Sequence, residues 1–90
     1  MNLEEAFGQA VRLKRRHVGL SQDQLAGLLE LQQGAVSRLE NGYVSATLDM
    51  VGRVAAALRT TPAALLQDAQ NLPGYVPVAD GKPRRSREAD

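Results

Sequence analysis

Two short helical segments separated by only two residues constrain this fold more than any other feature of the sequence. Ser21 and Gln24 have the spacing of a capping box, so the first helix is predicted to begin after Ser21 and to end near Leu29. Only Glu30 and Leu31 separate it from the second helix. Helices joined by so tight a turn cannot lie parallel, and we expect them to cross at a steep angle in a helix-turn-helix.

The second helix is predicted over about Gln32 to Asn41. Val36 and Leu39 recur at i, i+3 spacing and mark its inward side, and the Asn41-Gly42 pair ends it. Apolar or small side chains occupy the matching positions of the first helix and the turn, namely Leu25, Ala26, Leu29 and Leu31. This set of apolar positions makes the motif specific.

Three further helices complete the predicted chain. One is expected from Leu3 to about His17 and is capped by Asn2. Another begins after Thr47, and the last opens at the Thr61-Pro62 pair, with proline at the first helical position. We therefore predict an all-α fold, a compact bundle of about five helices, over residues 1–70.

Composition excludes several other classes of protein. The chain has no cysteine and one histidine, so we expect no disulfide, no metal site and no cofactor. We also predict that the protein is not an enzyme, because no nucleophile, base or glycine-rich phosphate loop can be assembled. No apolar run approaches the roughly 20 residues of a membrane span, and a cytoplasmic protein is expected.

Charge is unevenly distributed, although the net charge is only +1. Four basic and two acidic side chains give the first twenty residues a charge of +2. Three basic and four acidic side chains give residues 21–66 a charge of −1. Charge alone therefore does not identify a nucleic-acid-binding protein, and it is the helix-turn-helix motif that indicates one.

The last twenty residues differ in composition from the rest of the chain. Proline and glycine become frequent after Leu72, so residues 71–90 are predicted to form a flexible or partner-binding tail. The basic segment from Lys82 to Arg87 is either a nonspecific DNA contact or a stretch of mixed charge, because acidic residues flank it. The latter interpretation is favoured.

The segments from Gly19 to Ala26 and from Val36 to Gly42 resemble the phage-repressor and Cro type of helix-turn-helix, the xenobiotic-response-element family of bacterial regulators. The resemblance covers roughly residues 8–66. It implies a lambda-repressor-like fold that binds double-stranded operator DNA, usually as a homodimer on a palindromic site and usually to repress transcription. An antitoxin that binds a toxin partner through residues 71–90 and represses its own operon is the alternative.

The resemblance places base-reading side chains on the second motif helix. Gln33, Ser37 and Arg38 lie opposite its apolar side, and Arg bonds guanine while Gln bonds adenine in the major groove. The alternative is that these are only the solvent-facing side chains of an amphipathic helix. Within this motif we expect Gln33 and Arg38 to contact DNA.

Other polar residues are candidates for the DNA backbone or for capping. Gln22 resembles the family glutamine that contacts phosphate beside a helix N-terminus, and capping is its alternative role. Gln32 is expected mainly as a cap and secondarily as a base contact. Asn41 is expected to bind phosphate, to end the helix or to do both, and Tyr43 is a weaker phosphate candidate.

Two further pairs have structural assignments. Arg15 and Glu40 match the family pair that joins the first helix to the end of the recognition helix, and we expect a structural ion pair. Leu65 and Leu66 are predicted to form a dimer interface, because so short a helix has more apolar surface than its own domain can cover.

The motif also departs from the family pattern at two positions. Glu30 stands where the family usually has glycine in the turn, and a left-handed conformation there costs about 1–2 kcal/mol. Gly34 lies inside the recognition helix and weakens it by about 1 kcal/mol relative to alanine. Both departures are therefore expected to destabilise the motif relative to the family pattern.

Overall fold

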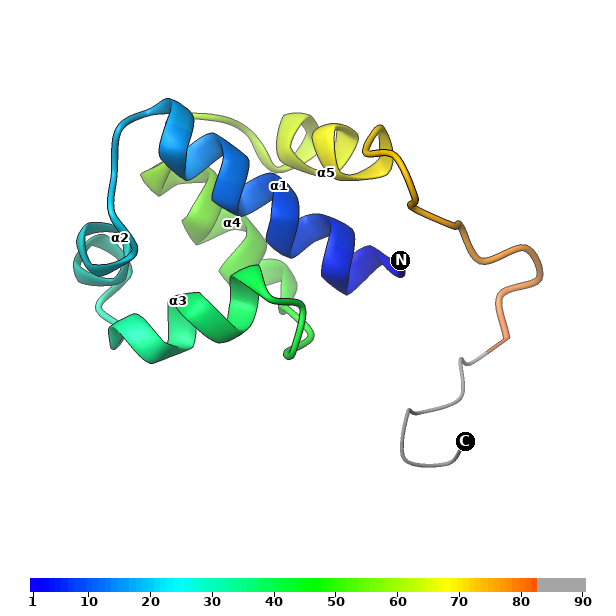
Figure 1. Ribbon diagram of the computed structural model, residues 1–90, viewed down its shortest axis with the longest axis horizontal. Coiled ribbons are helices and arrows are strands. Elements are labelled where there is room, and N and C mark those ends of the chain that lie inside the picture. Colours follow the sequence, from blue (N-terminus) through cyan, green and yellow to red (C-terminus); the bar gives the residue numbers. More distant parts are fainter. Residues whose placement is uncertain (83–90) are drawn as a thin grey trace.

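The computed structural model describes residues 1–82 and contains five helices and no strand over that range (Figure 1). Their bounds are α1 Leu3–His17, α2 Gln22–Leu29, α3 Gln33–Glu40, α4 Leu48–Ala57 and α5 Pro62–Gln70. The predicted all-α bundle is confirmed. Arg84, Arg85 and Arg87 of the predicted basic tail lie outside the described residues.

Side-chain caps explain where four of the helices begin. Each cap accepts a hydrogen bond from the backbone N–H three residues later, and the caps are Asn2, Ser21, Thr47 and Thr61. Gln32 occupies the cap position of α3 without a side-chain hydrogen bond, so the prediction that it caps this helix through its side chain is wrong.

The longest helix, α1, runs across the bundle between α5 on one side and α3 on the other (Figure 1). The buried core, to which α1 itself contributes, contains a single aromatic ring and is otherwise built from leucine, valine and alanine. Its buried residues are Ala6, Phe7, Ala10, Val11, Leu25, Ala26, Leu29, Val36, Leu39, Val51, Val54, Ala55, Leu58, Leu65 and Ala69. Between residues 1 and 82, no helix combines the length and apolar character needed to cross a bilayer.

Close packing of α1 against α3 depends on Gly8. A Cβ atom at this position would lie 2.4 Å from the carbonyl oxygen of Leu39 and 2.7 Å from that of Glu40. Both atoms belong to backbone, which cannot rotate away as a side chain can. Gly8 therefore sets how closely α1 approaches the end of α3.

The turn between α2 and α3 contains Glu30 in a left-handed backbone conformation. Glu30 has φ 57° and ψ 42°, and the Leu31 N–H donates to the Ala26 carbonyl at 2.9 Å, which ends α2. Arg53 of α4 donates from Nη2 to the carbonyl of Leu29. This carbonyl is at the C-terminal end of α2, where carbonyl groups have no partner within the helix. These contacts offset the conformational cost at Glu30.

The chain after α5 is bound to the start of α1. The N-terminal amino group of Met1 donates to the carbonyl of Gly74, and the Val76 N–H donates to the carbonyl of Met1 at 3.0 Å. Leu72 and Tyr75 pack against the core. The packed part of the chain thus extends beyond the predicted boundary at residue 70.

Candidate nucleic-acid interface

Apolar side chains hold α2 and α3 in a fixed crossing arrangement. The predicted anchors are all buried, namely Leu25, Ala26, Leu29, Val36 and Leu39, and Leu31 of the turn packs against the same core. This burial leaves the opposite side of α3 at the surface. We use the term polar face for the side chains that line it together with the start of α2, which are Gln22, Gln33, Ser37, Arg38 and Asn41.

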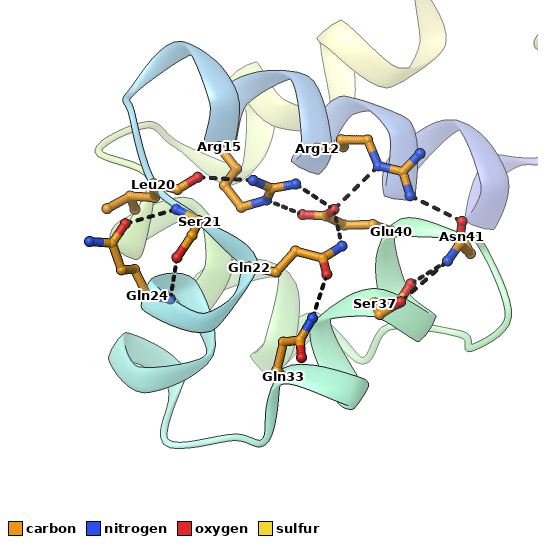
Figure 2. Close-up of polar contacts among 10 residues, drawn as sticks. All are labelled: Arg12, Arg15, Leu20, Ser21, Gln22, Gln24, Gln33, Ser37, Glu40 and Asn41. Atoms are coloured by element: carbon orange, nitrogen blue, oxygen red, sulfur yellow. Dashed lines mark hydrogen bonds and ion pairs between the residues drawn. The ribbon is translucent and has the colours of Figure 1, made fainter.

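The buried carboxylate of Glu40 organises this polar face (Figure 2). Arg15 donates from Nε to Glu40 Oε2 at 2.6 Å and from Nη2 to Oε1 at 3.0 Å. Gln22 Nε2 and Arg12 Nε also donate to Oε1, at 2.9 and 3.3 Å. The ion pair of Arg15 and Glu40 expected from the sequence is therefore present, within a larger network that joins α1, α2 and α3.

The network keeps Glu40 ionised. Burial raises the pKa of Glu40, but the hydrogen bonds from Arg15 and Gln22, the charge of Arg15 and the bond from Arg12 together lower it below its ordinary value. The hydrogen bond with Glu40 likewise raises the pKa of Arg15 against the opposing effect of its burial. Each group thus stabilises the charged form of the other.

Gln22 links the buried carboxylate to the recognition helix. Its Nε2 donates to Glu40, and its Oε1 accepts a hydrogen bond from Gln33 Nε2 at 3.0 Å (Figure 2). An amide nitrogen carries two hydrogens, so Gln33 retains one donor and its oxygen for a partner outside the protein. Gln33 is held in a defined orientation with the donor and acceptor that adenine recognition requires.

Arg38 extends along α3 over Gly34. A Cβ atom at Gly34 would lie 3.6 Å from Arg38 Nη1, so the guanidinium lies within van der Waals reach of this position. Side chains of a helix point toward its N-terminus, and this direction carries Arg38 over Gly34, one turn earlier on α3. Arg38 is exposed, so its guanidinium is accessible from outside the protein.

Both the nitrogen and the oxygen of the Asn41 side-chain amide form hydrogen bonds. Its Nδ2 donates to the carbonyl of Ser37 at 2.9 Å, and its Oδ1 accepts from Arg12 Nη2 at 3.0 Å. These bonds support the helix-ending role. Tyr43 is 67% exposed in the loop after α3, and the structure gives it no part in the network.

Sequence reasoning missed Arg12, which contacts both Glu40 and Asn41. A signal for it was present, because Arg12 and Arg15 stand at i, i+3 on α1 and therefore share one face. The family resemblance pairs Glu40 with Arg15 alone, whereas the structure brings both arginines of that face to Glu40.

The predicted dimer interface requires a correction. Leu65 is 0% exposed and belongs to the core, because α5 packs along the length of α1. It has no surface to offer to a second molecule. Leu66 is only half-buried and lines a hollow of about 240 Å³ beside the N-terminus of α1.

The tight turn, the buried anchors and the exposed polar face of α3 define the class of helix-turn-helix DNA-binding proteins. Residues 11–65 match the helix-turn-helix family designated HTH_3. The chain belongs to this family, in its XRE-type branch, and the resemblance seen in the sequence is confirmed. A comparison with curated proteins finds no match.

Solved structures of gene regulators are similar to this chain. The clp gene regulator ClgR from Corynebacterium glutamicum is 31% identical with a TM-score of 0.72, over 74% of this chain and 87% of that chain. The restriction-modification controller protein C.AhdI from Aeromonas hydrophila is 36% identical with a TM-score of 0.65, over 68% of this chain and 92% of that chain. The chain is accordingly a DNA-binding transcription regulator and not an enzyme.

An enzyme also contains a similar domain. Hydroxypropylphosphonic acid epoxidase from S. wedmorenis is 32% identical with a TM-score of 0.65, over 69% of this chain but only 33% of that chain. The likeness concerns one third of the epoxidase. The likeness therefore supports the fold assignment and gives no ground for assigning the epoxidase activity to this chain.

Proposed function

We propose that the protein represses transcription by binding a palindromic operator in double-stranded DNA as a homodimer. The observation that carries this proposal is the relay from buried Glu40 through Gln22 to Gln33, on the helix that also exposes Arg38. Such a preorganised set of donors and acceptors on α3 fits the edges of bases in the major groove. A reporter gene whose promoter overlaps the operator should lose expression when the protein is present.

Arg38→Ala should weaken operator binding by about 1–3 kcal/mol and relax the base preference at one position in each half-site. The physical reason is loss of a bidentate bond to guanine, whose N7 and O6 are both acceptors. Titrations of wild type and variant on operator and scrambled duplexes at several salt concentrations measure the effect. Binding to scrambled DNA should change little.

The same titrations separate Arg38 from a phosphate contact. A phosphate contact would weaken binding about equally on both duplexes and reduce the salt slope by about one. Affinity that is unchanged on both duplexes would remove Arg38 from the interface. Gly34→Ala serves as a companion variant, because its added Cβ makes an ordinary 3.6 Å contact with Arg38 and leaves the guanidinium in place.

For the homodimer, we propose an interface on the apolar patch formed by Leu3, Val44, Leu48 and Leu66. The first three are 43%, 40% and 87% exposed, and all four line the hollow beside α1. Glu4 also lines this hollow. A twofold axis next to the loop that follows α3 brings both recognition helices to one side of the dimer.

Leu48→Glu should convert the dimer to a monomer and weaken operator binding. The variant should still fold, because Leu48 is the first residue of α4 and a carboxylate is favourable at a helix N-terminus. Sedimentation velocity measures the change. Leu28→Glu, at an equally apolar but distant position that is 60% exposed, is the control and should remain dimeric. A dimer that survives Leu48→Glu unchanged would place the interface elsewhere.

An antitoxin that also represses its own operon is the second candidate. Val76 and Val78 favour it, since they are 58% and 50% exposed on the segment that follows α5. Purification from the native host tests it. A stoichiometric protein partner supports the antitoxin, and a dimer of this chain alone supports the plain repressor.

A further inference from the structure

We propose that Arg12 is a DNA phosphate contact at the edge of the polar face. This assignment rests on the proposed function and adds to it a contact from α1, outside the two motif helices. Four observations carry it: the charge of the Glu40 network, the exposure of Arg12, its free donors and its position beside Asn41.

The charges around Glu40 do not balance. Arg15 forms two short bonds to both carboxylate oxygens, at 2.6 and 3.0 Å, and by itself neutralises Glu40. Arg12 adds only one longer bond, at 3.3 Å. Two guanidinium groups against one carboxylate leave the network with one excess positive charge, which resides at Arg12.

The two arginines also differ in accessibility. The side chain of Arg15 is 8% exposed, whereas that of Arg12 is 31% exposed. A guanidinium has five N–H donors, and the structure engages only two of those on Arg12, one at Nε and one at Nη2. Its Nη1 has no partner among residues 1–82, so Arg12 can bind a second anion without releasing Glu40.

The position of Arg12 fits a backbone contact. Its Nη2 bonds Asn41, which in turn bonds the carbonyl of Ser37 on α3 (Figure 2). The guanidinium therefore lies at the rim of the polar face, next to the end of the recognition helix, where the sugar-phosphate backbone borders a helix in the major groove.

The loop after α3 has no cationic side chain that could bind the DNA backbone. Residues 42–47 contain no lysine or arginine, so this loop offers no charged side chain to the backbone. Phosphate contacts fix the register of a recognition helix on the duplex and supply much of its affinity. Arg12 supplies the missing charge from α1.

The test is the salt dependence of DNA binding by wild type and Arg12 variants, with proteins checked for folding by thermal melting. Arg12→Gln removes the charge but retains an amide donor for Asn41, and it should reduce the slope of log K against log salt by about 0.9 on operator and scrambled duplexes alike. Arg12→Lys keeps the charge and should keep the slope. Arg59→Ala, an exposed arginine at the connection between α4 and α5, is the control and should keep the slope as well.

The outcomes distinguish this assignment from the proposed function. An unchanged slope for Arg12→Gln, with or without a change in melting temperature, would overturn the phosphate contact and leave Arg12 as a support for Asn41. Base preference should be the same for wild type and Arg12→Gln, since phosphate carries no sequence information. Wild type without affinity for any duplex would overturn both the contact and the DNA-binding function.

Discussion

Glu40→Ala is expected to lower the free energy of unfolding by about 3 kcal/mol, because it leaves Arg15 buried without its carboxylate. Gln22 also loses its acceptor, so the side chain that orients Gln33 becomes free to rotate. For a domain of this size the melting temperature should fall by about 15 °C. Thermal and urea unfolding followed by circular dichroism measure the loss.

A double variant separates the loss of the charge pair from a general effect of mutation. Arg15→Met with Glu40→Leu removes both charges together, and it should recover most of the stability that Glu40→Ala loses. DNA binding should stay impaired in the double variant, because Gln22 still lacks its acceptor. A Glu40→Ala variant that unfolds like wild type would show that the network does not support the fold.

The lowered pKa of Glu40 also predicts how stability depends on pH. A carboxyl group with a lower pKa in the folded state contributes stability above its ordinary pKa of about 4.3 and loses it as pH falls through the folded value. The difference in unfolding free energy between wild type and Glu40→Ala should therefore shrink below about pH 4. A difference that stays constant down to pH 2 would contradict the lowered pKa.

Gly8→Ala is expected to have the second large effect, a loss of about 3 kcal/mol. The new Cβ would lie 2.4 Å from a backbone oxygen of α3, and neither helix can yield without disturbing the core. Because α3 carries the polar face, DNA affinity should fall together with stability. Unfolding experiments and operator titrations measure the two effects.

Two other helical glycines provide matched controls. A Cβ at Gly27 or Gly52 would meet nothing within 4 Å, so alanine there should stabilise the protein by about 0.5–1 kcal/mol through helix propensity alone. The sign of the effect is thus expected to differ between Gly8 and these positions. Stabilisation by Gly8→Ala would show that α1 and α3 are not in such close contact.

The helices could be located from sequence because their ends are encoded locally. The side chains of Ser21 and Thr47 each accept a hydrogen bond from the backbone N–H three residues later, and Glu30 ends α2 through its left-handed conformation. Such signals depend on neighbours in the chain and need no knowledge of the fold. The pairing of Arg15 with Glu40 was accessible through the family resemblance, which supplied a contact across 25 residues.

The remaining features depend on contacts between distant segments. Gly8 is important because α1 approaches α3 closely, and nothing in the neighbouring residues marks that approach. Leu65 has the same local pattern as a surface leucine, and its burial follows from the length of α1 that covers α5. The role of Gln22 as a link between Glu40 and Gln33 likewise becomes visible only when α2 is packed against α3.

Methylation interference shows whether α3 reads bases in the major groove. Sites are first enriched by the wild-type protein from a pool of random duplexes and then methylated at guanine N7, in the major groove, or at adenine N3, in the minor groove. We predict that methylation of one guanine N7 in each half-site blocks wild-type binding, that Arg38→Ala is insensitive to it, and that adenine N3 methylation has no effect. Interference confined to adenine N3, or no enriched sequence at all, would contradict base reading by α3 in the major groove.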